Sequence, residues 1–303
     1  MRLGYIGLGN MGGGMAKCLA AAGHDVLVHD ARREAAAPQI EAGAKWADTP
    51  AKVAAHAEMI FTSLPGPPVI EDVVYGKNGI AETLKRGSVY IDCSTTSPTQ
   101  IRRIYADFKT RGIDGMDSPV SGLVSGAWAG QLALYIGGDP EVMERVRPIF
   151  EVIGKSLNYC GPIGAGTIVK LVHNQAASVY HAALAEGFTM AMKAGVDLEV
   201  ALKGVSEGAV GLGKTIALFP KIVFGGEFKI EGLGMPLSYA HKDLSIATQV
   251  GREFKVPMPL SQMVEDDMVA AMNDGLGHKE HTVFLTRQEK RAGIEMRTKK
   301  AKA

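Results

Sequence analysis

Short apolar segments alternate with helical patterns along the first half of the chain. Buried strands are predicted at Met1–Ile6, Asp25–His29, Met59–Leu64, Ser88–Asp92, Ile113–Asp117 and Leu132–Ile136, and a helix at Pro140–Ile153. Such alternation is typical of a parallel sheet that is covered by helices. In these sheets ligands bind beyond the carboxyl ends of the strands, so the residues that follow each strand are the first candidates for function.

The pattern changes after residue 162. Strand signals fade, and helical patterns rich in alanine, methionine and leucine continue to about Glu289. We therefore predict an α/β domain with a doubly wound sheet at residues 1–162, followed by an all-helical domain at residues 163–303.

The stretch from Ile168 to Ala194 is apolar enough to be considered as a membrane span. Lys170, His173 and Glu186 interrupt it, however, and charged side chains at the centre of a bilayer are costly. A long buried helix is the preferred interpretation, and no membrane partner is expected.

Composition narrows the environment of the protein. The 303 residues are 46% hydrophobic and 21% charged, with a formal net charge of +1 at pH 7. This composition is typical of a globular protein, and the small net charge gives no overall positive electrostatic potential that would attract nucleic acid. Cys18, Cys93 and Cys160 lie far apart, so we expect a reducing, cytoplasmic environment and no metal site.

A glycine-rich segment, Gly7-Leu8-Gly9-Asn10-Met11-Gly12, joins the first predicted strand to a helical stretch. Glycines at this spacing allow a tight turn, a close approach of backbone to phosphate, and close packing of helix on strand. The N-terminus of the helix offers N–H groups and a positive dipole end to an anion. These features predict a site for the pyrophosphate of a dinucleotide. The alternative is an ordinary strand–helix turn, which is weaker because the second strand and its terminal Asp30 follow in the expected order.

Asp30 and the residues after it bear on the choice of cofactor. A carboxylate at the end of the second strand can accept hydrogen bonds from the ribose hydroxyls of NAD, and it would repel the 2′-phosphate of NADP. Arg32 and Arg33 favour the opposite choice, because a guanidinium can bind a phosphate. Since Asp30 lies where the ribose must lie, we predict a preference for NAD, with some use of NADP through Arg32.

Two later segments carry groups for chemistry. The segment Asp117–Gly122 either forms a nest of N–H groups and hydroxyls for a carboxylate or merely turns. Lys170 and Asn174 lie one helical turn apart on a shared face. A buried lysine beside an amide can act as a general acid–base if burial lowers its pKa from about 10.4, although a lone lysine can also extend to solvent. His173 is interpreted as a structural helix histidine.

Together these segments resemble the β-hydroxyacid dehydrogenase family, which includes 3-hydroxyisobutyrate dehydrogenase and tartronate semialdehyde reductase. Residues 7–16 resemble its cofactor fingerprint, residues 117–138 its substrate motif, residues 164–174 its catalytic motif and residues 242–244 its late cofactor motif. The resemblance implies a Rossmann domain, a helical domain built around one long helix, and a homodimer or homotetramer formed through the helical domains.

The resemblance also implies roles for individual residues. Lys170 is the catalytic residue and Asn174 its substrate-side partner, while Ser121 and Gly122 bind the substrate carboxylate. The residues implied to lie at the cofactor are Leu64, Pro65, Thr95 and Lys242, although Lys242 by itself could equally belong to an exposed turn. Family members that reduce imines lack the lysine, so its presence favours alcohol–carbonyl chemistry.

Three positions depart from the family pattern: Gly14 stands where the family usually has proline, Cys18 stands where it usually has asparagine, and the third is Leu123. Leu123 replaces a second glycine that normally follows Ser-Gly, and a leucine there changes the shape of the substrate pocket. We expect an oxidoreductase that transfers a hydride between NAD(P) and a β-hydroxyacid or semialdehyde. Two alternatives remain: reduction of an imine or larger carbonyl compound, suggested by Leu123, and nucleotide sensing without catalysis, which would not need Lys170.

The C-terminal tail is basic. It is interpreted as a solvated, frayed end on the basis of Arg287, Lys290, Arg291, Arg297, Lys299, Lys300 and Lys302.

Overall fold

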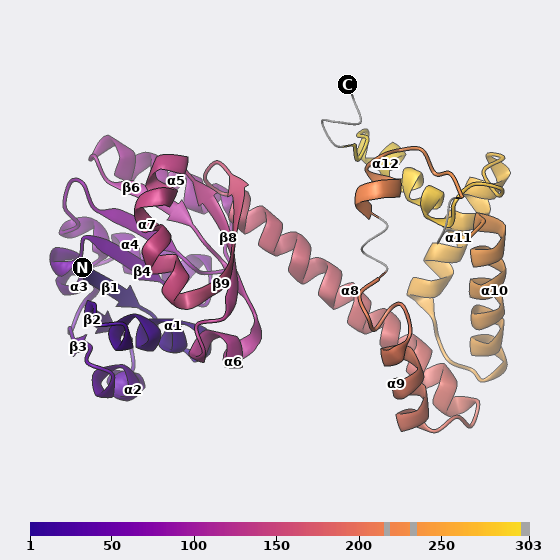
Figure 1. The fold of residues 1–303 in the computed structure, drawn as a ribbon, viewed down its shortest axis with the longest axis horizontal. Coiled ribbons are helices and arrows are strands. Elements are labelled where there is room, and N and C mark those ends of the chain that lie inside the picture. The colour runs from indigo at the N-terminus through magenta and orange to yellow at the C-terminus, as the bar shows by residue number, and fades with distance from the viewer. Residues whose placement is uncertain (215–218, 231–234, 298–303) are drawn as a thin grey trace. The chain divides into compact units, whose positions relative to one another are not determined.

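The computed structural model describes residues 1–214, 219–230 and 235–297 (Figure 1). The chain forms two compact units, Met1–Ala176 and Ala177–Ala303. The first combines a sheet with helices, and the described part of the second is mostly helical. The predicted fold class is therefore confirmed.

The first unit is built on a nine-stranded sheet. Its strands are β1 (Arg2–Ile6), β2 (Asp25–His29), β3 (Lys45–Trp46), β4 (Met59–Thr62), β5 (Val89–Asp92), β6 (Asp114–Asp117), β7 (Val120–Ser121), β8 (Leu132–Gly138) and β9 (Gly154–Gly161). Their order is β3-β2-β1-β4-β5-β6-β8-β7, with β9 beside β8. The portion from β3 to β6 has the strand order of a doubly wound Rossmann sheet.

The carboxyl ends of five strands meet along one edge of this sheet. β1, β2, β4, β5 and β6 run parallel, and Ile6, His29, Thr62, Asp92 and Asp117 form one registered row across them. The loops that follow these five residues therefore leave the sheet at the same edge, where a ligand of a doubly wound sheet binds.

Helices bury both faces of the sheet. Successive residues of a strand point to opposite faces, and accordingly Tyr5 lies in one hydrophobic cluster and Ile6 in the other. Burial on both faces explains why the parallel strands read as apolar runs. The helical elements of this unit are α1 (Asn10–Ala21), η1 (Arg33–Ala36), α2 (Ala37–Glu41), α3 (Pro50–His56), α4 (Pro67–Tyr75), η2 (Ile80–Glu82), α5 (Pro98–Thr110), α6 (Leu123–Trp128), α7 (Pro140–Ile153) and the beginning of α8 (Ala165–Lys193).

The far side of the sheet departs from the sequence prediction. β8 was expected among parallel strands but runs antiparallel to β6. The segment Gly154–Gly161, for which no element was predicted, forms β9 beside β8. Most side chains of β9 are at least partly exposed, so the segment lacks the apolar run by which a buried strand is recognised.

The long helix α8 is confirmed, but it is not buried as predicted. Many of its apolar side chains are exposed in the single chain, including Val172 at 62%. Its buried Glu186 accepts hydrogen bonds from the backbone N–H groups of Leu260 (2.8 Å) and Ser261 (3.0 Å), so a charge that interrupts the apolar stretch serves to hold another helix. Among the described residues, no helix has the length and hydropathy that crossing a membrane requires.

The described part of the second unit contains further helices around its own core. The core includes Phe228, Leu237 and Met268. The helices are α9 (Leu198–Glu207), η3 (Phe219–Val223), α10 (Leu237–Glu253), α11 (Pro259–Asn273), η4 (His281–Leu285) and α12 (Thr286–Ala292).

The basic residues near the C-terminus are paired rather than frayed. The ion pairs are Arg287–Asp274, Lys290–Asp274, Arg291–Asp267 and Arg297–Glu289. The predicted fraying is therefore wrong for these four basic residues, because their acidic partners lie on neighbouring elements that a count of charges does not identify. The side chains of Lys290 and Arg291 are still more than half exposed, as expected for a solvated end. Lys299, Lys300 and Lys302 lie outside the described residues.

Candidate functional site

The turn between β1 and α1 has the geometry of a phosphate loop. Gly7 adopts a left-handed φ of +94°, and its N–H donates to the carbonyl oxygen of His29 at 3.0 Å. A Cβ on Gly12 would lie 2.0 Å from the carbonyl oxygen of Gly7, so only glycine allows the helix to begin this close to the strand. Helix α1 begins at Asn10 without a side-chain cap, and the space beside Gly9 is open. These residues fit a dinucleotide pyrophosphate.

Asp30 fastens the glycine turn to the end of β2. Its carboxylate accepts hydrogen bonds from the backbone N–H groups of Leu8 (2.7 Å) and Arg32 (2.9 Å). The guanidinium of Arg32 lies 3.8 Å from the same carboxylate, on a side chain that is 67% exposed. A carboxylate oxygen can accept more than one hydrogen bond, so Asp30 keeps acceptor capacity for ribose hydroxyls.

The loops after β4 and β5 are joined by a buried polar network. The backbone N–H of Leu64 donates to Ser94 Oγ at 2.8 Å, and Pro65 and Thr95 are exposed beside these positions. Beneath them, Asp92 Oδ1 accepts from Thr62 Oγ1 (2.9 Å) and from the N–H of Ser94 (3.0 Å).

Asp92 is the buried centre of this network. Burial raises the pKa of the Asp92 carboxyl to about 6, and within the described part of the chain its Oδ2 has no hydrogen-bond partner. Asp92 was not among the predicted site residues, although its position at the end of a predicted strand was a signal that could have identified it.

Asp117 ties the sheet to the first turn of α8. Its carboxylate, which is fully buried, accepts from the N–H of Gly164 (2.6 Å), the N–H of Thr167 (2.6 Å) and Thr167 Oγ1 (2.8 Å). A Cβ on Gly166 would lie 2.0 Å from the carbonyl oxygen of Tyr135, so the helix begins in direct contact with β8. Asp117, the last residue of β6, was assigned to the substrate segment, but its carboxylate caps the helix.

Lys170 follows one turn after this cap. It is only 8% exposed, and burial lowers the pKa of its amine. Asn174, one further turn along α8, is half-buried. The structure thus gives Lys170 the burial and the lowered pKa that a general acid–base needs.

His173 lies between two predicted substrate residues. Its Nε2 is 3.3 Å from Ser121 Oγ, and its Nδ1 is 3.2 Å from Asn174 Oδ1. Its ring packs near that of Tyr135, with the centroids 6.0 Å apart. His173 was interpreted from the sequence as a structural helix histidine. Its spacing of three residues from Lys170 was the signal that could have placed it on the same face.

Leu123 begins α6 in a strained conformation. Gly122 precedes it with φ +138°, and Leu123 itself has φ +61° and is 80% exposed. The backbone at this position is left-handed, a conformation that glycine adopts easily and leucine adopts only with strain. The smaller backbone freedom expected for leucine therefore appears as strain at Leu123.

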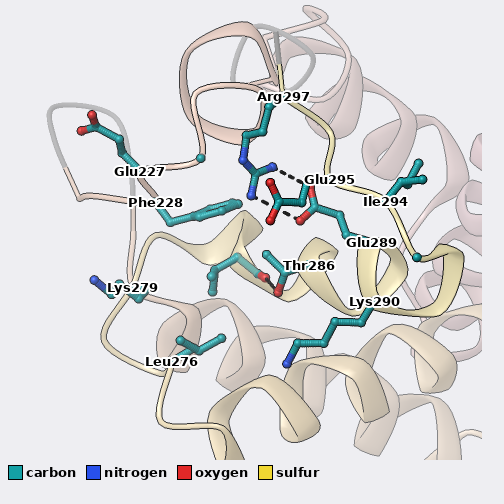
Figure 2. Close-up of a pocket in the computed structure, with 13 residues that line it drawn as sticks. Glu227, Phe228, Leu276, Lys279, Thr286, Glu289, Lys290, Ile294, Glu295 and Arg297 are labelled. Carbon is teal, nitrogen blue, oxygen red and sulfur yellow. Dashed lines mark hydrogen bonds and ion pairs between the residues drawn. The ribbon is translucent and has the colours of Figure 1, made fainter. Parts of the chain in front are cut away.

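The second unit contains Lys242 and a separate cavity. Lys242 lies on α10, is exposed, and its Nζ is 3.0 Å from Asp243 Oδ1. The cavity, of about 580 Å³, contains no predicted site residue, and its buried Glu289 is already paired with Arg297 (Figure 2). In the part of the chain that the structure describes, no group of three or more acidic, histidine or cysteine side chains could hold a metal ion.

Comparison with known proteins matches both halves of the chain. Residues 2–161 match the family described as the NAD binding domain of 6-phosphogluconate dehydrogenase. Residues 164–287 match the family described as NAD-binding of NADP-dependent 3-hydroxyisobutyrate dehydrogenase.

Two curated relatives match over nearly their whole lengths. The chain is 33% identical to 3-sulfolactaldehyde reductase of Escherichia coli (strain K12), covering 98% of this chain and 99% of that protein. It is 32% identical to 2-(hydroxymethyl)glutarate dehydrogenase of Eubacterium barkeri, covering 98% and 97%.

An imine reductase from Myxococcus stipitatus, solved in complex with NADP⁺, has a TM-score of 0.83 over 95% of this chain and 99% of that one. At 17% identity this likeness shows the fold alone. The two family matches and the full-length relatives show more: the chain belongs to the β-hydroxyacid dehydrogenase family, as an NAD(P)-dependent oxidoreductase that acts on CH–OH groups.

Proposed function

We propose that Lys170 is the general acid–base in hydride transfer between NAD(P) and a small β-hydroxyacid or its semialdehyde. The observation that carries this proposal is a buried lysine with a lowered pKa, on a helix that Asp117 fixes to the functional edge of the sheet. A lysine placed at random on an exposed helix would have neither property.

The cofactor would be held mainly by the first unit. The turn from Gly7 to Gly12 and the N-terminus of α1 would bind its pyrophosphate, and Asp30 would accept from the ribose of NAD. Leu64, Pro65 and Thr95 would line the neighbouring loops, and the family resemblance adds Lys242 to the cofactor residues. When bound, the nicotinamide accepts or supplies the hydride.

Residues of this chain would bind the substrate and transfer its proton. Ser121, Gly122 and Asn174 would bind and orient the substrate, with Leu123 at the rim. In oxidation, neutral Lys170 would take the proton of the substrate hydroxyl, and in reduction the charged lysine would give a proton to the carbonyl oxygen. The names of the two relatives, one a hydroxymethyl dicarboxylate dehydrogenase and one a sulfonated aldehyde reductase, support an acidic substrate.

We further infer that residues 1–162 form the cofactor domain and residues 163–303 the domain for substrate and self-association. An apolar groove of about 370 Å³ between α8 and α9 supports self-association, since a helix of a second copy would cover it. We expect a homodimer or homotetramer, detectable by light scattering over a range of protein concentrations. A cytoplasmic location fits three cysteines that form no disulfide.

The test is an activity screen with NAD(H) and NADP(H) over 3-hydroxyisobutyrate, 2-(hydroxymethyl)glutarate, 3-sulfolactaldehyde, succinic semialdehyde and a cyclic imine. Turnover of a hydroxyacid or semialdehyde that is lost in Lys170→Met supports the proposal. Turnover of the imine alone, or equal rates in wild type and Lys170→Met, would contradict it.

A further inference from the structure

The side chain of His173 links β7 to α8 through two of the predicted substrate residues. Ser121 comes from β7 and Asn174 from α8, and one imidazole ring contacts both. Lys170 lies one turn earlier on the same helix. The histidine is exposed, so it is not placed there by the packing of a core.

The hydrogen bonds of the ring depend on its charge. Asn174 Oδ1 is an acceptor, so the facing Nδ1 carries a proton. In the neutral ring Nε2 then has no proton and must accept the hydroxyl proton of Ser121. In the protonated ring Nε2 donates to Ser121 Oγ, and the hydroxyl proton is released to point elsewhere.

This difference decides what Ser121 can bind. A serine whose proton is held by His173 presents only lone pairs, which repel an anion. A serine that accepts from His173 can donate its proton to a carboxylate or sulfonate, and the positive ring strengthens that interaction.

We propose that His173 is a specificity residue of the substrate site, which takes up a proton when an anionic substrate binds and so turns the Ser121 hydroxyl towards it. The inference rests on the proposed role of Ser121 in substrate binding. The proton comes from solvent and forms an N–H bond at Nε2 of His173; no other covalent bond of the protein or the substrate is made or broken.

Three other charged or titratable side chains lie near the imidazole ring of His173. Lys170 precedes it on α8, and Tyr135 faces it from β8. The Asp117 carboxylate at the start of α8 is fully buried and already accepts three hydrogen bonds. All three groups are present in wild type and in the His173 variants, so proton uptake by Lys170 is common to both and the difference between them is assigned to the histidine.

The experiment measures binding without turnover. 3-Hydroxyisobutyrate and 2-(hydroxymethyl)glutarate are titrated into the protein saturated with NADH, by calorimetry at pH 6.0 and 8.0 in buffers of different ionisation enthalpy. 2-Methyl-1,3-propanediol, in which CH₂OH replaces the carboxylate of 3-hydroxyisobutyrate, is the uncharged probe. The variants are His173→Gln, which can donate to Asn174 and accept from Ser121 but cannot take up a proton, His173→Ala and Ser121→Ala.

For wild type we expect proton uptake with the acids and binding about tenfold tighter at pH 6.0 than at pH 8.0, the scale of one charge-assisted hydrogen bond. His173→Gln should lose both the proton uptake and the pH dependence of binding. In a Ser121→Ala background, His173→Ala should cause little further loss of affinity for the acids. His278→Ala, at an exposed loop histidine, is the control and should match wild type.

Three outcomes would overturn the inference. His173→Gln could keep the wild-type proton uptake, or the uncharged diol could bind with the same uptake as the acids. If wild type binds neither acid, both this inference and the proposed function fail, whereas binding that is unaffected by His173 leaves the proposed function standing.

Discussion

The carboxylate of Asp117 accepts two hydrogen bonds from Thr167, one from its N–H at 2.6 Å and one from its hydroxyl at 2.8 Å. The residues are 50 positions apart, and the contact joins the end of β6 to the first turn of the helix that carries Lys170. Two sequence motifs that looked independent are therefore parts of one buried structure.

Loss of this contact should lower both stability and turnover. Thr167→Val keeps the shape of the side chain but leaves Asp117 without the hydroxyl, and we expect a loss of about 1–2 kcal/mol in the free energy of unfolding. Thr167→Ser keeps the hydroxyl and is the control. Urea denaturation with activity measurements checks this. Equal stability of the valine and serine variants would show that the hydroxyl contributes nothing.

Lys170→Met should abolish most turnover and still stabilise the protein. A general acid–base typically contributes about 10²–10⁴-fold to the rate. Because burial lowers the pKa of Lys170, the folded state binds its proton less tightly than the unfolded state does, and stability is reduced wherever the unfolded lysine is charged. The thermal midpoint at pH 7 should therefore rise in Lys170→Met, while Lys155→Met, at an exposed lysine of β9, should change neither property.

The same lowered pKa sets the direction of the pH profile. Oxidation requires the neutral amine, so kcat at saturating substrate should rise as pH increases through the lowered pKa of Lys170 and then level off. A kcat that does not change across that range would exclude Lys170 as the base.

Asp92 should make stability depend on pH in the acid range. Its pKa is raised to about 6 by burial, so the folded state holds the proton more tightly than the unfolded state. The resulting stability is fully present below about pH 4, the usual range of an aspartate, and is lost as pH rises through 6, by about 3 kcal/mol. Asp92→Asn should remove this dependence, as measured by urea denaturation at pH 4.5 and 7.5.

Asp48 gives a control of opposite sign. A hydrogen bond from Lys52 lowers its pKa, so its contribution is present at neutral pH and disappears in acid. If Asp92→Asn and Asp48→Asn shifted the pH dependence in the same direction, the assignment of Asp92 would be wrong.

The sequence predicted the elements that have local signals. The strand at Asp25–His29 and the helix at Pro140–Ile153 have the predicted bounds, because a run of apolar residues ends in each case at an identifiable residue. Neither β9 nor the partners of Asp117 and His173 could be predicted. Those features depend on contacts between segments far apart in the chain, and local periodicity carries no information about them.

Leu123→Gly should relieve strain without loss of stability. Leu123 has a φ of +61° and is 80% exposed, so the variant loses little buried area and gains a residue suited to that backbone. We expect a gain of up to about 1 kcal/mol over Leu123→Ala, which keeps the left-handed strain. If Leu123 also shapes the substrate site, the ranking of kcat/KM among substrates of different size should change.

The preference between cofactors should follow Asp30. Wild type should favour NAD, since Asp30 would lie against the 2′-phosphate of NADP, and Arg32→Ala should strengthen that preference by removing the nearby guanidinium. The check is kcat/KM for both cofactors. A wild type that favours NADP, with no further gain for NADP in Asp30→Asn, would show that the arginines decide.

The cap formed by Asp117 also determines where the chain can be cut. A fragment that stops at residue 162 would retain Asp117 inside the sheet but would lack both Gly164 and Thr167, the residues that satisfy its carboxylate. A buried carboxylate without donors is strongly unfavourable. An autonomous dinucleotide-binding fragment must therefore extend through the first turns of α8, and limited proteolysis of the intact protein should release a stable fragment that ends beyond Thr167.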